Sequence, residues 1–380
     1  MADSDQITLD DENSFVTRAD AKRMVQQAVA EAMLYLSRAP APIKVFGLTG
    51  SNEYAKKVAA SMGIKLTPHV DKVFDDGEGH AKSASDKAGN VRGHDVFVIQ
   101  SLFGDGKRSV CDKFVELCMF CGSLRDASAE KITAVIPHLA WARQDRKTES
   151  RAPISTKYVA QMLESIGVNR CLFIDVHNLA AQQNAYRIPI DVLEVKNLHA
   201  KWCADRLIAK KSRKVRVVSP DSGGLPRCTR FRNALAGCLG EAHPDNIEIC
   251  IYDKVRDPLT GQVTGGRIIG DIADADAIIY DDLISTATTM GKAYKAVNEA
   301  GGHVLSLAAA HGVCCGKVNE VFDQIGCPIV LADTIAPYRL SAANRDKIEF
   351  LDTSKMVGDA MMRIHRGTGS ISELLEAPKA

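Results

Sequence analysis

From residue 43 onward, short apolar runs alternate with longer segments in which apolar residues recur at helical spacing. The runs contain few polar residues, a pattern typical of strands that are buried on both faces of a sheet. Because strands and helices alternate, we predict parallel sheets joined by right-handed crossovers. The apolar runs span residues 96–99, 132–136, 171–174, 215–218, 247–251, 277–280, 304–310 and 328–331.

The number of predicted strands favours two sheets over one. We therefore predict an α/β fold with two parallel-sheet domains, residues 43–189 and 190–380, divided near Pro189. The last amphipathic segment, residues 353–365, is expected to form a helix that packs back on the first of these domains.

Residues 1–42 are predicted to form an N-terminal extension of this fold. The first 13 residues are acidic and contain no basic residue, which is typical of a solvated segment. Asp20 is expected to cap a helix that runs to about Arg38, where the sequence APAP stops it. This extension is expected to serve in packing or as an oligomer arm.

Composition narrows the class of protein. The net charge of +1 shows no basic excess, so we expect no nucleic-acid partner. No run of 18 apolar residues occurs, and the N-terminus lacks the basic and apolar segments of a secretory signal, so no membrane association is expected. The 11 cysteines lie mostly in apolar or helical stretches, which favours reduced thiols and a cytoplasmic location. Cys118 and Cys121 have Cys-x-x-Cys spacing, but core packing is expected for them.

Polar residues follow the predicted strands directly. Open parallel sheets bind ligands at the carboxyl ends of their strands, so these positions predict a binding site. Any single Asp or Ser there is also common in turns, and the prediction depends on the whole series. The series includes Asp175, His177, Asp221, Asp253, Lys254, Asp281, Asp282, His311 and Thr334.

The segment 281–289, with the sequence DDLISTATT, is the most informative of these strand ends. A helix is predicted to begin at about Thr288, and the amides at a helix start suit a phosphate group. Asp281 and Asp282 would repel phosphate, so we interpret them as acceptors for sugar hydroxyls or as ligands of Mg²⁺. The simpler alternative is an N-capped helix with solvated acids.

Three other strand ends are candidate parts of the site. In the segment 219–227, two glycines permit close approach of a ligand, Asp221 is a candidate metal ligand and Arg227 is placed to reach a phosphate. His177 is a second candidate metal ligand, although a histidine at a strand end is more often structural. The basic segment 141–151 is predicted to face a polyphosphate.

Lys254 and Arg256 lead into a segment without apolar periodicity, residues 257–266. Two cations on a loop of this kind are suited to close over a phosphoryl-type transition state and exclude water. An ordinary surface loop is the alternative.

Taken in order, these segments resemble the ribose-phosphate pyrophosphokinases, also called phosphoribosyl pyrophosphate synthetases. The resemblance extends over roughly residues 44–365, and it rests on the joint order of its motifs. The motifs are 90–93 (NVRG) with 98–101 (VIQS), 142–147 (ARQDRK) with 150–154 (SRAPI), 175–177 (DVH), 219–224 (SPDSGG), 253–256 (DKVR), Gly270-Asp271 and the 281–289 segment.

The resemblance implies two domains of the type I phosphoribosyltransferase kind and a homo-oligomer, either a dimer or a hexamer. It also implies transfer of the pyrophosphoryl group of Mg·ATP to the 1-hydroxyl of ribose 5-phosphate, with release of AMP. The implied ATP-binding residues are Phe74, Asp76, Glu78, Arg143, Gln144 and Arg151. The implied metal ligands are His177 and Asp221, and the implied catalytic pair is Lys254 and Arg256. The implied ribose-5-phosphate site is Asp281, Asp282, Ser285, Thr286, Ala287, Thr288 and Thr289.

The sequence departs from the family pattern at several positions. Ser285 stands where an aspartate is common, and Ala287 and Thr288 stand where glycines are usual. If the loop needs a positive φ at Thr288, that residue would be strained by about 1–3 kcal/mol. The segment 103–111, in a region linked to allosteric phosphate and ADP in classical members, also differs.

Two other functions stay open from the sequence. A regulatory relative without activity is favoured by the altered loop and opposed by the retained Lys254, Arg256, His177 and Asp221. A phosphoribosyltransferase would explain the 281–289 segment but not the Arg143-Gln144 segment or the doubled sheet.

Overall fold

The computed structural model describes residues 6–8, 15–37, 41–82, 89–240, 247–256 and 263–376. The chain divides into two compact units, Met1–Ala41 and Pro42–Ala380. The division of the larger unit into two domains near Pro189 stays a prediction. No helix in the described ranges is long and apolar enough to cross a membrane.

In the first unit, strands β1 (Gln6–Thr8) and β2 (Phe15–Thr17) pair antiparallel, and helix α1 (Arg18–Ser37) follows. The predicted cap at Asp20 is wrong. The backbone N–H of Asp20 donates to Thr17 Oγ1 at 3.2 Å, and the two side chains contact each other at 2.6 Å. The helix therefore begins one turn earlier than expected, and Thr17 caps it.

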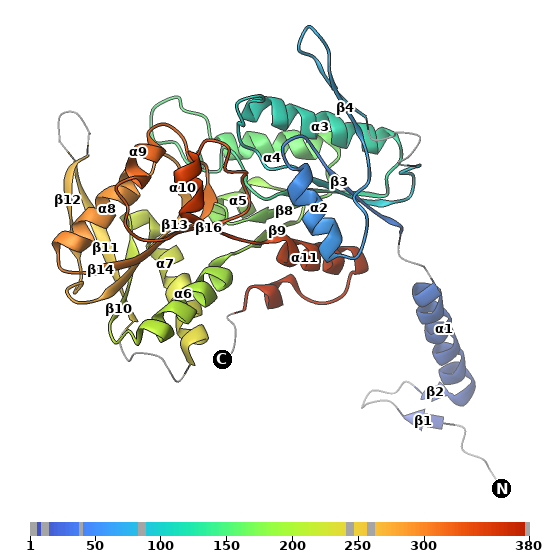
Figure 1. Cartoon of the computed structure of the whole chain (residues 1–380). Coiled ribbons are helices and arrows are strands. Elements are labelled where there is room, and N and C mark those ends of the chain that lie inside the picture. The colour runs from blue at the N-terminus through green and yellow to red at the C-terminus, as the bar shows by residue number, and fades with distance from the viewer. Residues whose placement is uncertain are drawn as a thin grey trace. The chain divides into compact units, whose positions relative to one another are not determined.

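The first sheet of the larger unit has five parallel strands in the order β3-β6-β7-β8-β9 (Figure 1). Alternate strand residues enter two different apolar clusters, so both faces of the sheet are covered. Helices α3 and α4 pack on one face and α2 on the other. The elements are β3 (Ile43–Gly47), α2 (Asn52–Ser61), β6 (Asp95–Ile99), α3 (Val110–Asp126), β7 (Lys131–Ile136), α4 (Ser155–Ile166), β8 (Arg170–Ile174), α5 (Leu179–Ala185) and β9 (Ile190–Leu193).

The second sheet has seven strands in the order β12-β11-β10-β13-β14-β15-β16, and β12 alone runs antiparallel to its neighbour. Helices α6 and α7 cover one face, and α8 and α9 cover the other. The elements are α6 (Lys196–Lys210), β10 (Val215–Ser219), η1 (Ser222–Gly224), α7 (Leu225–Leu239), β11 (Ile247–Arg256), β12 (Val263–Ile269), β13 (Asp276–Ile284), α8 (Thr288–Glu299), β14 (His303–Gly312), α9 (Val318–Phe322), β15 (Ile329–Ala332), α10 (Ala342–Asp346) and β16 (Ile348–Leu351).

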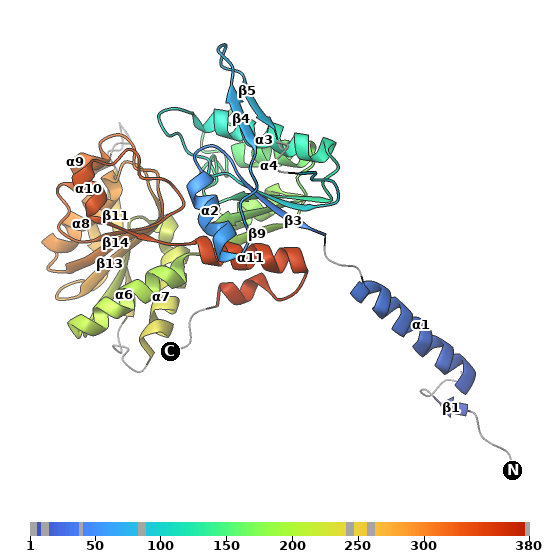
Figure 2. The same cartoon turned by 45° about the vertical axis from the view of Figure 1, so that its right-hand side comes forward.

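The C-terminal helix α11 (Ser354–Arg366) follows β16 of the second sheet and packs against α2, the helix that covers one face of the first sheet (Figure 2). Tyr54 and Thr353 join their hydroxyls at 2.7 Å, and Ser61 Oγ donates to the Ser354 carbonyl at 3.1 Å. Gly358 permits this close approach, because a Cβ atom there would lie 2.2 Å from Ser61 Oγ. The short helix η3 (Ile371–Leu374) follows.

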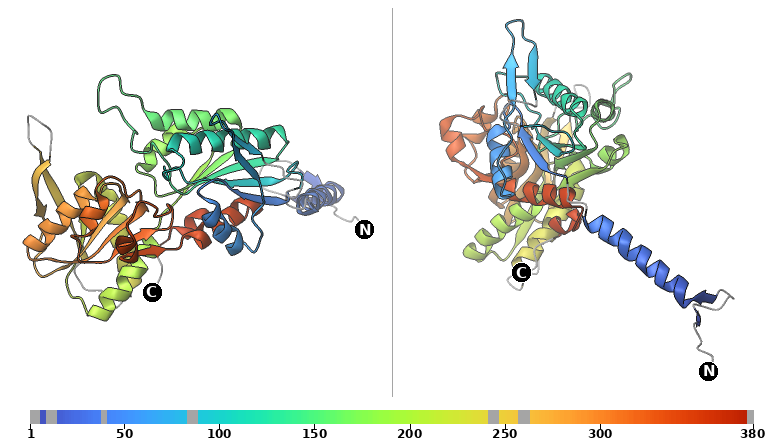
Figure 3. Two further views of the ribbon diagram at one scale, coloured as in Figure 1. Left: turned by 45° about the horizontal axis from the view of Figure 1, so that its top comes forward. Right: turned by 90° about the vertical axis from the view of Figure 1, so that its right-hand side faces the viewer.

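A hairpin of β4 (Val70–Val73) and β5 (Gly79–Lys82) lies outside both large sheets (Figure 3). The residues of β4 are all exposed. The hairpin is tied to the body of the unit by Arg108, whose guanidinium pairs with Asp71 at 3.0 Å and with Glu116 on α3 at 3.1 Å.

Candidate active site

A cavity of about 910 Å³ opens at the carboxyl ends of β8, β10, β11 and β13. Both large sheets contribute to it, since β8 belongs to the first and the other three to the second. This is the edge at which the strand-end residues were predicted to meet. Of the predicted site residues, the cavity is lined by Arg143, His177, Asp221, Asp281, Asp282, Ser285, Thr286, Ala287, Thr288 and Thr289.

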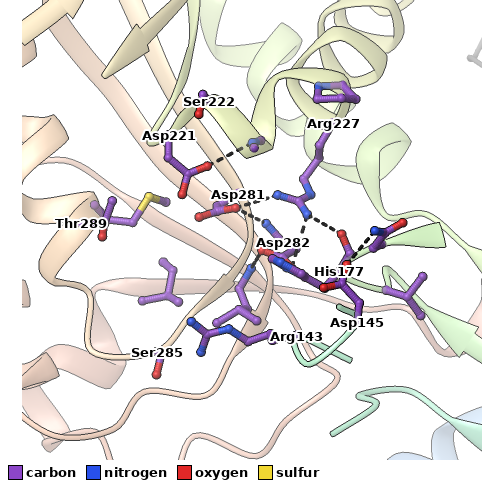
Figure 4. Close-up of a pocket in the computed structure, with 18 of the residues that line it drawn as sticks. Arg143, Asp145, His177, Asp221, Ser222, Arg227, Asp281, Asp282, Ser285 and Thr289 are labelled. Carbon is purple, nitrogen blue, oxygen red and sulfur yellow. Dashed lines mark hydrogen bonds and ion pairs between the residues drawn. The ribbon is translucent and has the colours of Figure 1, made fainter. Parts of the chain in front are cut away.

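Two carboxylates at the end of β13 form the floor of the site. Arg227, near the start of α7, donates from Nη1 to Asp281 at 2.7 Å, and its Nη2 lies 3.3 Å from Asp282 (Figure 4). Its side chain is only 11% exposed. The sequence interpretation placed Arg227 against a phosphate, whereas the structure commits it to the two acids.

His177 closes this cluster from the other sheet. Its Nδ1 lies 2.6 Å from Asp282 Oδ2, and Arg227 Nη2 contacts the His177 carbonyl at 3.4 Å. The hydrogen bond to Asp282 raises the pKa of His177. We call His177, Arg227, Asp281 and Asp282 the strand-end cluster.

The two acids of the strand-end cluster titrate differently. Burial and the neighbouring charge of Asp282 raise the pKa of Asp281 to about 8. Burial alone would raise the pKa of Asp282 as well, but the His177 hydrogen bond and the Arg227 charge hold it well below its usual range. Two buried adjacent carboxylates do not both ionise easily, and the contacts of Arg227 and His177 oppose their mutual repulsion.

Asp221 lies beside this cluster at the end of β10. Its Oδ1 accepts the Gly224 N–H at 3.0 Å and so caps the short helix η1. Gly224 has no room for a side chain, because a Cβ atom would lie 2.6 Å from Ser219 Oγ. Close approach of a ligand was predicted for the glycines of this turn. At Gly224 the group that approaches closely is the Ser219 side chain of the protein itself.

The carboxylates at the strand ends are possible ligands for Mg²⁺. In the part of the chain that the structure describes, no three His, Cys, Asp or Glu side chains lie close enough to hold a metal ion. Mg²⁺ is usually held by one or two carboxylates together with waters and substrate phosphates. The carboxylates of Asp221 and the acid pair therefore fit Mg²⁺ that enters with a phosphate ligand, and not a metal held by protein alone.

The segment 285–289 curves from β13 into α8, which begins at Thr288 as predicted. The left-handed residue of this turn is Ala287, with φ at 60°, and Thr288 is already helical. The strain that was expected at Thr288 is therefore one position earlier. Backbone bonds from Cys314 to the Ile284 carbonyl and from Cys315 to the Ser285 carbonyl support the turn from a neighbouring loop.

The predicted nucleotide residues are less closely grouped. Arg143 lines the cavity, but Gln144 and Arg151 are not among its lining residues. The Gln144 side chain instead accepts a hydrogen bond from Ser155 at the start of α4. Phe74, at the tip of the β4–β5 hairpin, is 42% exposed and also lies outside the lining.

The other two hairpin residues, Asp76 and Glu78, are exposed as well and do not line the cavity. The Glu78 N–H donates to Asp76 Oδ1 at 3.0 Å, so these residues order the hairpin turn. Their predicted contact with a nucleotide stays a prediction.

Lys254 and Arg256 form the end of β11. Their side chains lie outside the described part of the structure, so their roles stay predictions. The preceding Asp253 lines the cavity, which places the end of this strand at its edge.

Several lining residues were not predicted. Asn178 caps α5 and donates from Nδ2 to Asp145 at 2.6 Å, and this contact holds the basic segment against the end of β8. Arg230 lies one helical turn after Arg227, and Tyr252 directly precedes Asp253. Asn178 follows a predicted strand closely, so its place in the site could have been predicted from the sequence. Arg230 could not, because its direction depends on how α7 is rotated about its axis.

The chain is similar to known proteins over most of its length. Residues 43–167 match the family model described as the N-terminal domain of ribose phosphate pyrophosphokinase. Residues 245–376 match the phosphoribosyl synthetase-associated domain. A Streptococcus pyogenes protein named ribose-phosphate pyrophosphokinase 1 is 35% identical over 328 residues, covering 85% of this chain and 94% of that protein.

A second relative comes from a eukaryote. The Schizosaccharomyces pombe protein named ribose-phosphate pyrophosphokinase 2 is 30% identical over 339 residues, which is 89% of this chain and 98% of that protein. The crystal structure of phosphoribosylpyrophosphate synthetase from Mycobacterium smegmatis matches with a TM-score of 0.75 at 23% identity, covering 86% of this chain and 100% of that one. This likeness confirms the predicted two-sheet fold of the type I phosphoribosyltransferase kind.

Proposed function

This chain belongs to the ribose-phosphate pyrophosphokinase family, and we propose that it makes 5-phosphoribosyl 1-pyrophosphate from ATP and ribose 5-phosphate. In this reaction O1 of the sugar attacks the β-phosphorus of ATP. The bond between that phosphorus and the oxygen bridging to the α-phosphate breaks, AMP leaves with the bridging oxygen, and the O1 proton passes to solvent or a base.

The observation that carries this proposal is the convergence of two kinds of group in one cavity. The acid pair Asp281 and Asp282 meets the hydroxyl-lined start of α8, residues 285–289, and the cation Arg143 lines the same cavity. Carboxylates suit the hydroxyls of a sugar, while amides and hydroxyls at a helix start suit its phosphate. The cationic wall suits a polyphosphate.

We assign ribose 5-phosphate to the side of the cavity formed by β13 and α8. Thr286 and Thr288 join their hydroxyls at 3.0 Å and stay exposed to solvent, where a phosphate can replace this contact with two donated hydrogen bonds. Arg227 lowers the electrostatic cost of keeping two carboxylates in the site.

We assign the ATP phosphates to the side that carries Arg143 and Arg146, which both line the cavity. Lys254 and Arg256 are assigned to the transferring group, because their strand reaches the cavity at Asp253. Mg²⁺, when bound with the nucleotide, supplies neutralisation of phosphate charge. Asp221 and the acid pair would hold it through carboxylates, and the resemblance adds His177 as a further ligand.

The test is a direct assay. Purified protein with Mg²⁺, ATP and ribose 5-phosphate should form AMP and 5-phosphoribosyl 1-pyrophosphate in equal amounts. Omission of ribose 5-phosphate, or its replacement by ribose, should abolish both products. No AMP above background across several divalent metals and phosphate concentrations would overturn the proposal and favour the regulatory relative.

The phosphoribosyltransferase alternative makes a different prediction in the same assay. Such an enzyme would consume 5-phosphoribosyl 1-pyrophosphate with a nucleobase and would need no ATP. The first part of the chain favours the ATP-dependent reaction, because residues 43–167 match the N-terminal domain of ribose phosphate pyrophosphokinase and supply Arg143 and Arg146 to the cavity.

We also propose a cytoplasmic location and a homo-oligomer, either a dimer or a hexamer. All 11 cysteines are free thiols, which suits a reducing compartment. Light scattering on the purified full chain would distinguish the oligomeric states.

A further inference from the structure

His311 lies at the end of β14, outside the cavity lining, and is 2% exposed. Strand pairing places it opposite Leu283 of β13, next to Asp282 of the strand-end cluster. Its Nε2 lies 2.9 Å from the Asp175 carbonyl and 3.0 Å from the Ile174 carbonyl, both at the end of β8 in the other sheet. One imidazole therefore spans the strand ends of both sheets.

The hydrogen bonds of His311 define its tautomer. A carbonyl oxygen only accepts hydrogen bonds, so Nε2 must carry the proton. In the neutral ring Nδ1 is then an acceptor, and the Thr334 hydroxyl lies 2.8 Å from it. The ring is thus held from both nitrogens, and His138 packs edge-on against it with the ring centres 4.7 Å apart.

The backbone that His311 contacts is in an uncommon conformation. Asp175 has a φ of 38°, and left-handed residues other than glycine persist where surrounding contacts hold them. Within the first sheet, its N–H donates to the Leu193 carbonyl at 2.8 Å and its Oδ2 accepts the Val195 N–H at 2.8 Å. From the second sheet, its carbonyl accepts from His311.

This turn decides where His177 lies, because Asp175 precedes it by only two residues. His177 in turn meets Asp282 at 2.6 Å, and Asp282 neighbours the strand position of His311. His311 on β14 thus contacts the Asp175 turn, this turn leads to His177, and His177 contacts Asp282 on β13, the strand that pairs with β14. We propose that His311 is a positioning residue of the reaction, which fixes the Asp175 turn and so holds His177 in register with the acid pair.

The test by kcat rests on the proposed function. A second test, the NMR resonance of the His177 ring, needs no activity. His311→Phe removes the hydrogen bonds of both ring nitrogens and keeps an aromatic ring in the core. His311→Gln can restore a donor toward Asp175 and an acceptor toward Thr334. His199 on α6 supplies the matched control, since it is fully buried where this helix packs on the second sheet, its Nε2 contacts the Val330 carbonyl at 3.3 Å, and it does not line the cavity.

In the folded fraction, His311→Phe should lower kcat by about 10- to 100-fold, because misplacement by about 1 Å costs that much. His311→Gln should recover a substantial part of this loss, and His199→Phe should lower the melting temperature without lowering kcat. The ring resonance of His177 in the NMR spectrum, assigned with His177→Asn, should shift in His311→Phe and stay in place in His199→Phe.

Unchanged kcat and an unmoved His177 resonance in folded His311→Phe would overturn the inference. If that variant does not fold, Thr334→Val decides, because it keeps the His311 ring and removes the hydroxyl that contacts His311 Nδ1 at 2.8 Å and the Ala310 carbonyl at 3.2 Å. We expect Thr334→Val to lower kcat several-fold and to shift the His177 resonance, and no change in either quantity would again overturn it. An inactive wild-type protein would refute the proposed function and leave the resonance test of His311 intact.

Discussion

The strand-end cluster and the β4–β5 hairpin both carry residues that we assign to substrates, yet the fold holds them very differently. The side chains of Arg227 and Asp282 are 11% and 5% exposed, and each contacts more than one partner. Phe74 on the hairpin is 42% exposed and contacts Lys72 of the same hairpin, with Nζ 4.6 Å from the ring centre. The sugar side of the site is therefore preorganised by buried contacts, whereas the Phe74 side chain at the hairpin tip is largely open to solvent.

The largest expected effect tests the buried side of this comparison. Arg227→Met should lower the free energy of unfolding by about 3–5 kcal/mol, because it leaves two buried carboxylates without their cation. Arg230→Met on the same helix is the control, since Arg230 is 47% exposed and pairs with Glu194 at 2.8 Å. Its loss should cost less than about 1 kcal/mol in denaturant unfolding. Equal losses in the two variants would contradict a preorganised cluster.

Lys254 should separate activity from stability. Lys254→Ala is expected to remove at least about 2 kcal/mol of transition-state stabilisation, which is about 30-fold in kcat/KM. If Lys254 acts in catalysis alone, the free energy of unfolding should change by less than about 0.5 kcal/mol. Lys214→Ala is the control, because Lys214 pairs with Asp271 at 2.7 Å near the opposite ends of the strands. An equal kcat/KM in both variants would remove Lys254 from the mechanism.

The hairpin gives the opposite pattern to the cluster. Phe74→Ala should raise the KM for ATP about 5- to 10-fold if its ring stacks on the nucleotide base, an interaction of about 1 kcal/mol. The KM for ribose 5-phosphate and the melting temperature should stay the same. Val73→Ala, at a position 49% exposed on the same hairpin, should change neither constant. A loss of stability in Phe74→Ala would show that the hairpin is part of the core.

The same contrast explains what the sequence predicts. All eight apolar runs lie in strands of the two large sheets, because burial on both faces leaves an apolar signal. In the two large sheets, the described strands without a predicted run are the edge strands β3, β9, β12 and β16. Edge strands meet solvent on one side, and β16 accordingly exposes Glu349 and Phe350.

Side-chain partners were harder to predict than strand ends. The sequence placed Asp281, Asp282 and His177 at strand ends, and the topology then brought them together. That Arg227 faces acids instead of a phosphate depends on the register of α7, which no local pattern encodes. The nucleotide role of Phe74 came from family resemblance alone, since an exposed ring on a hairpin has no signal of its own.

A smaller effect concerns the contact between His177 and Asp282. The pKa of His177 is raised, so its stabilisation is complete below its ordinary pKa of about 6.5 and is lost as pH rises through the raised value. The pKa of Asp282 is lowered, so its stabilisation is present above its ordinary pKa of about 3.8 and is lost as pH falls through the lowered value. The contact should therefore contribute most between about pH 4 and 6.5.

His177→Asn should accordingly reduce the free energy of unfolding more at pH 5.5 than at pH 8.5. The imidazole is 40% exposed, so solvent screening limits the difference to about 1 kcal/mol or less. Chemical denaturation at both pH values measures it, with the exposed His303→Asn as the control. An equal loss at both pH values would mean that Asp282 is held by Arg227 alone.

The smallest effect concerns the loop that departs from the family pattern. Ala287, with φ at 60°, carries the left-handed turn and is 5% exposed, so Ala287→Gly has opposing consequences. Glycine relieves about 1–2 kcal/mol of backbone strain. It also removes a buried methyl group worth about 0.8 kcal/mol and adds about 0.5–1 kcal/mol of unfolded-state entropy. The net change in the free energy of unfolding should stay within about 1 kcal/mol, and the KM for ribose 5-phosphate should not rise.

Thr288→Gly is the matched comparison for this loop, because Thr288 is already helical and needs no relief of strain. We expect it to cost up to about 1 kcal/mol of stability from glycine in a helix, while ribose-5-phosphate binding stays intact. Calorimetric titration of ribose 5-phosphate into both variants measures the second quantity. A large loss of affinity in Thr288→Gly alone would show that the Thr288 hydroxyl is a phosphate ligand. The loop would then have replaced the flexibility of glycine with a side-chain donor, and its departure from the family pattern would be a gain in binding chemistry instead of a weakened site.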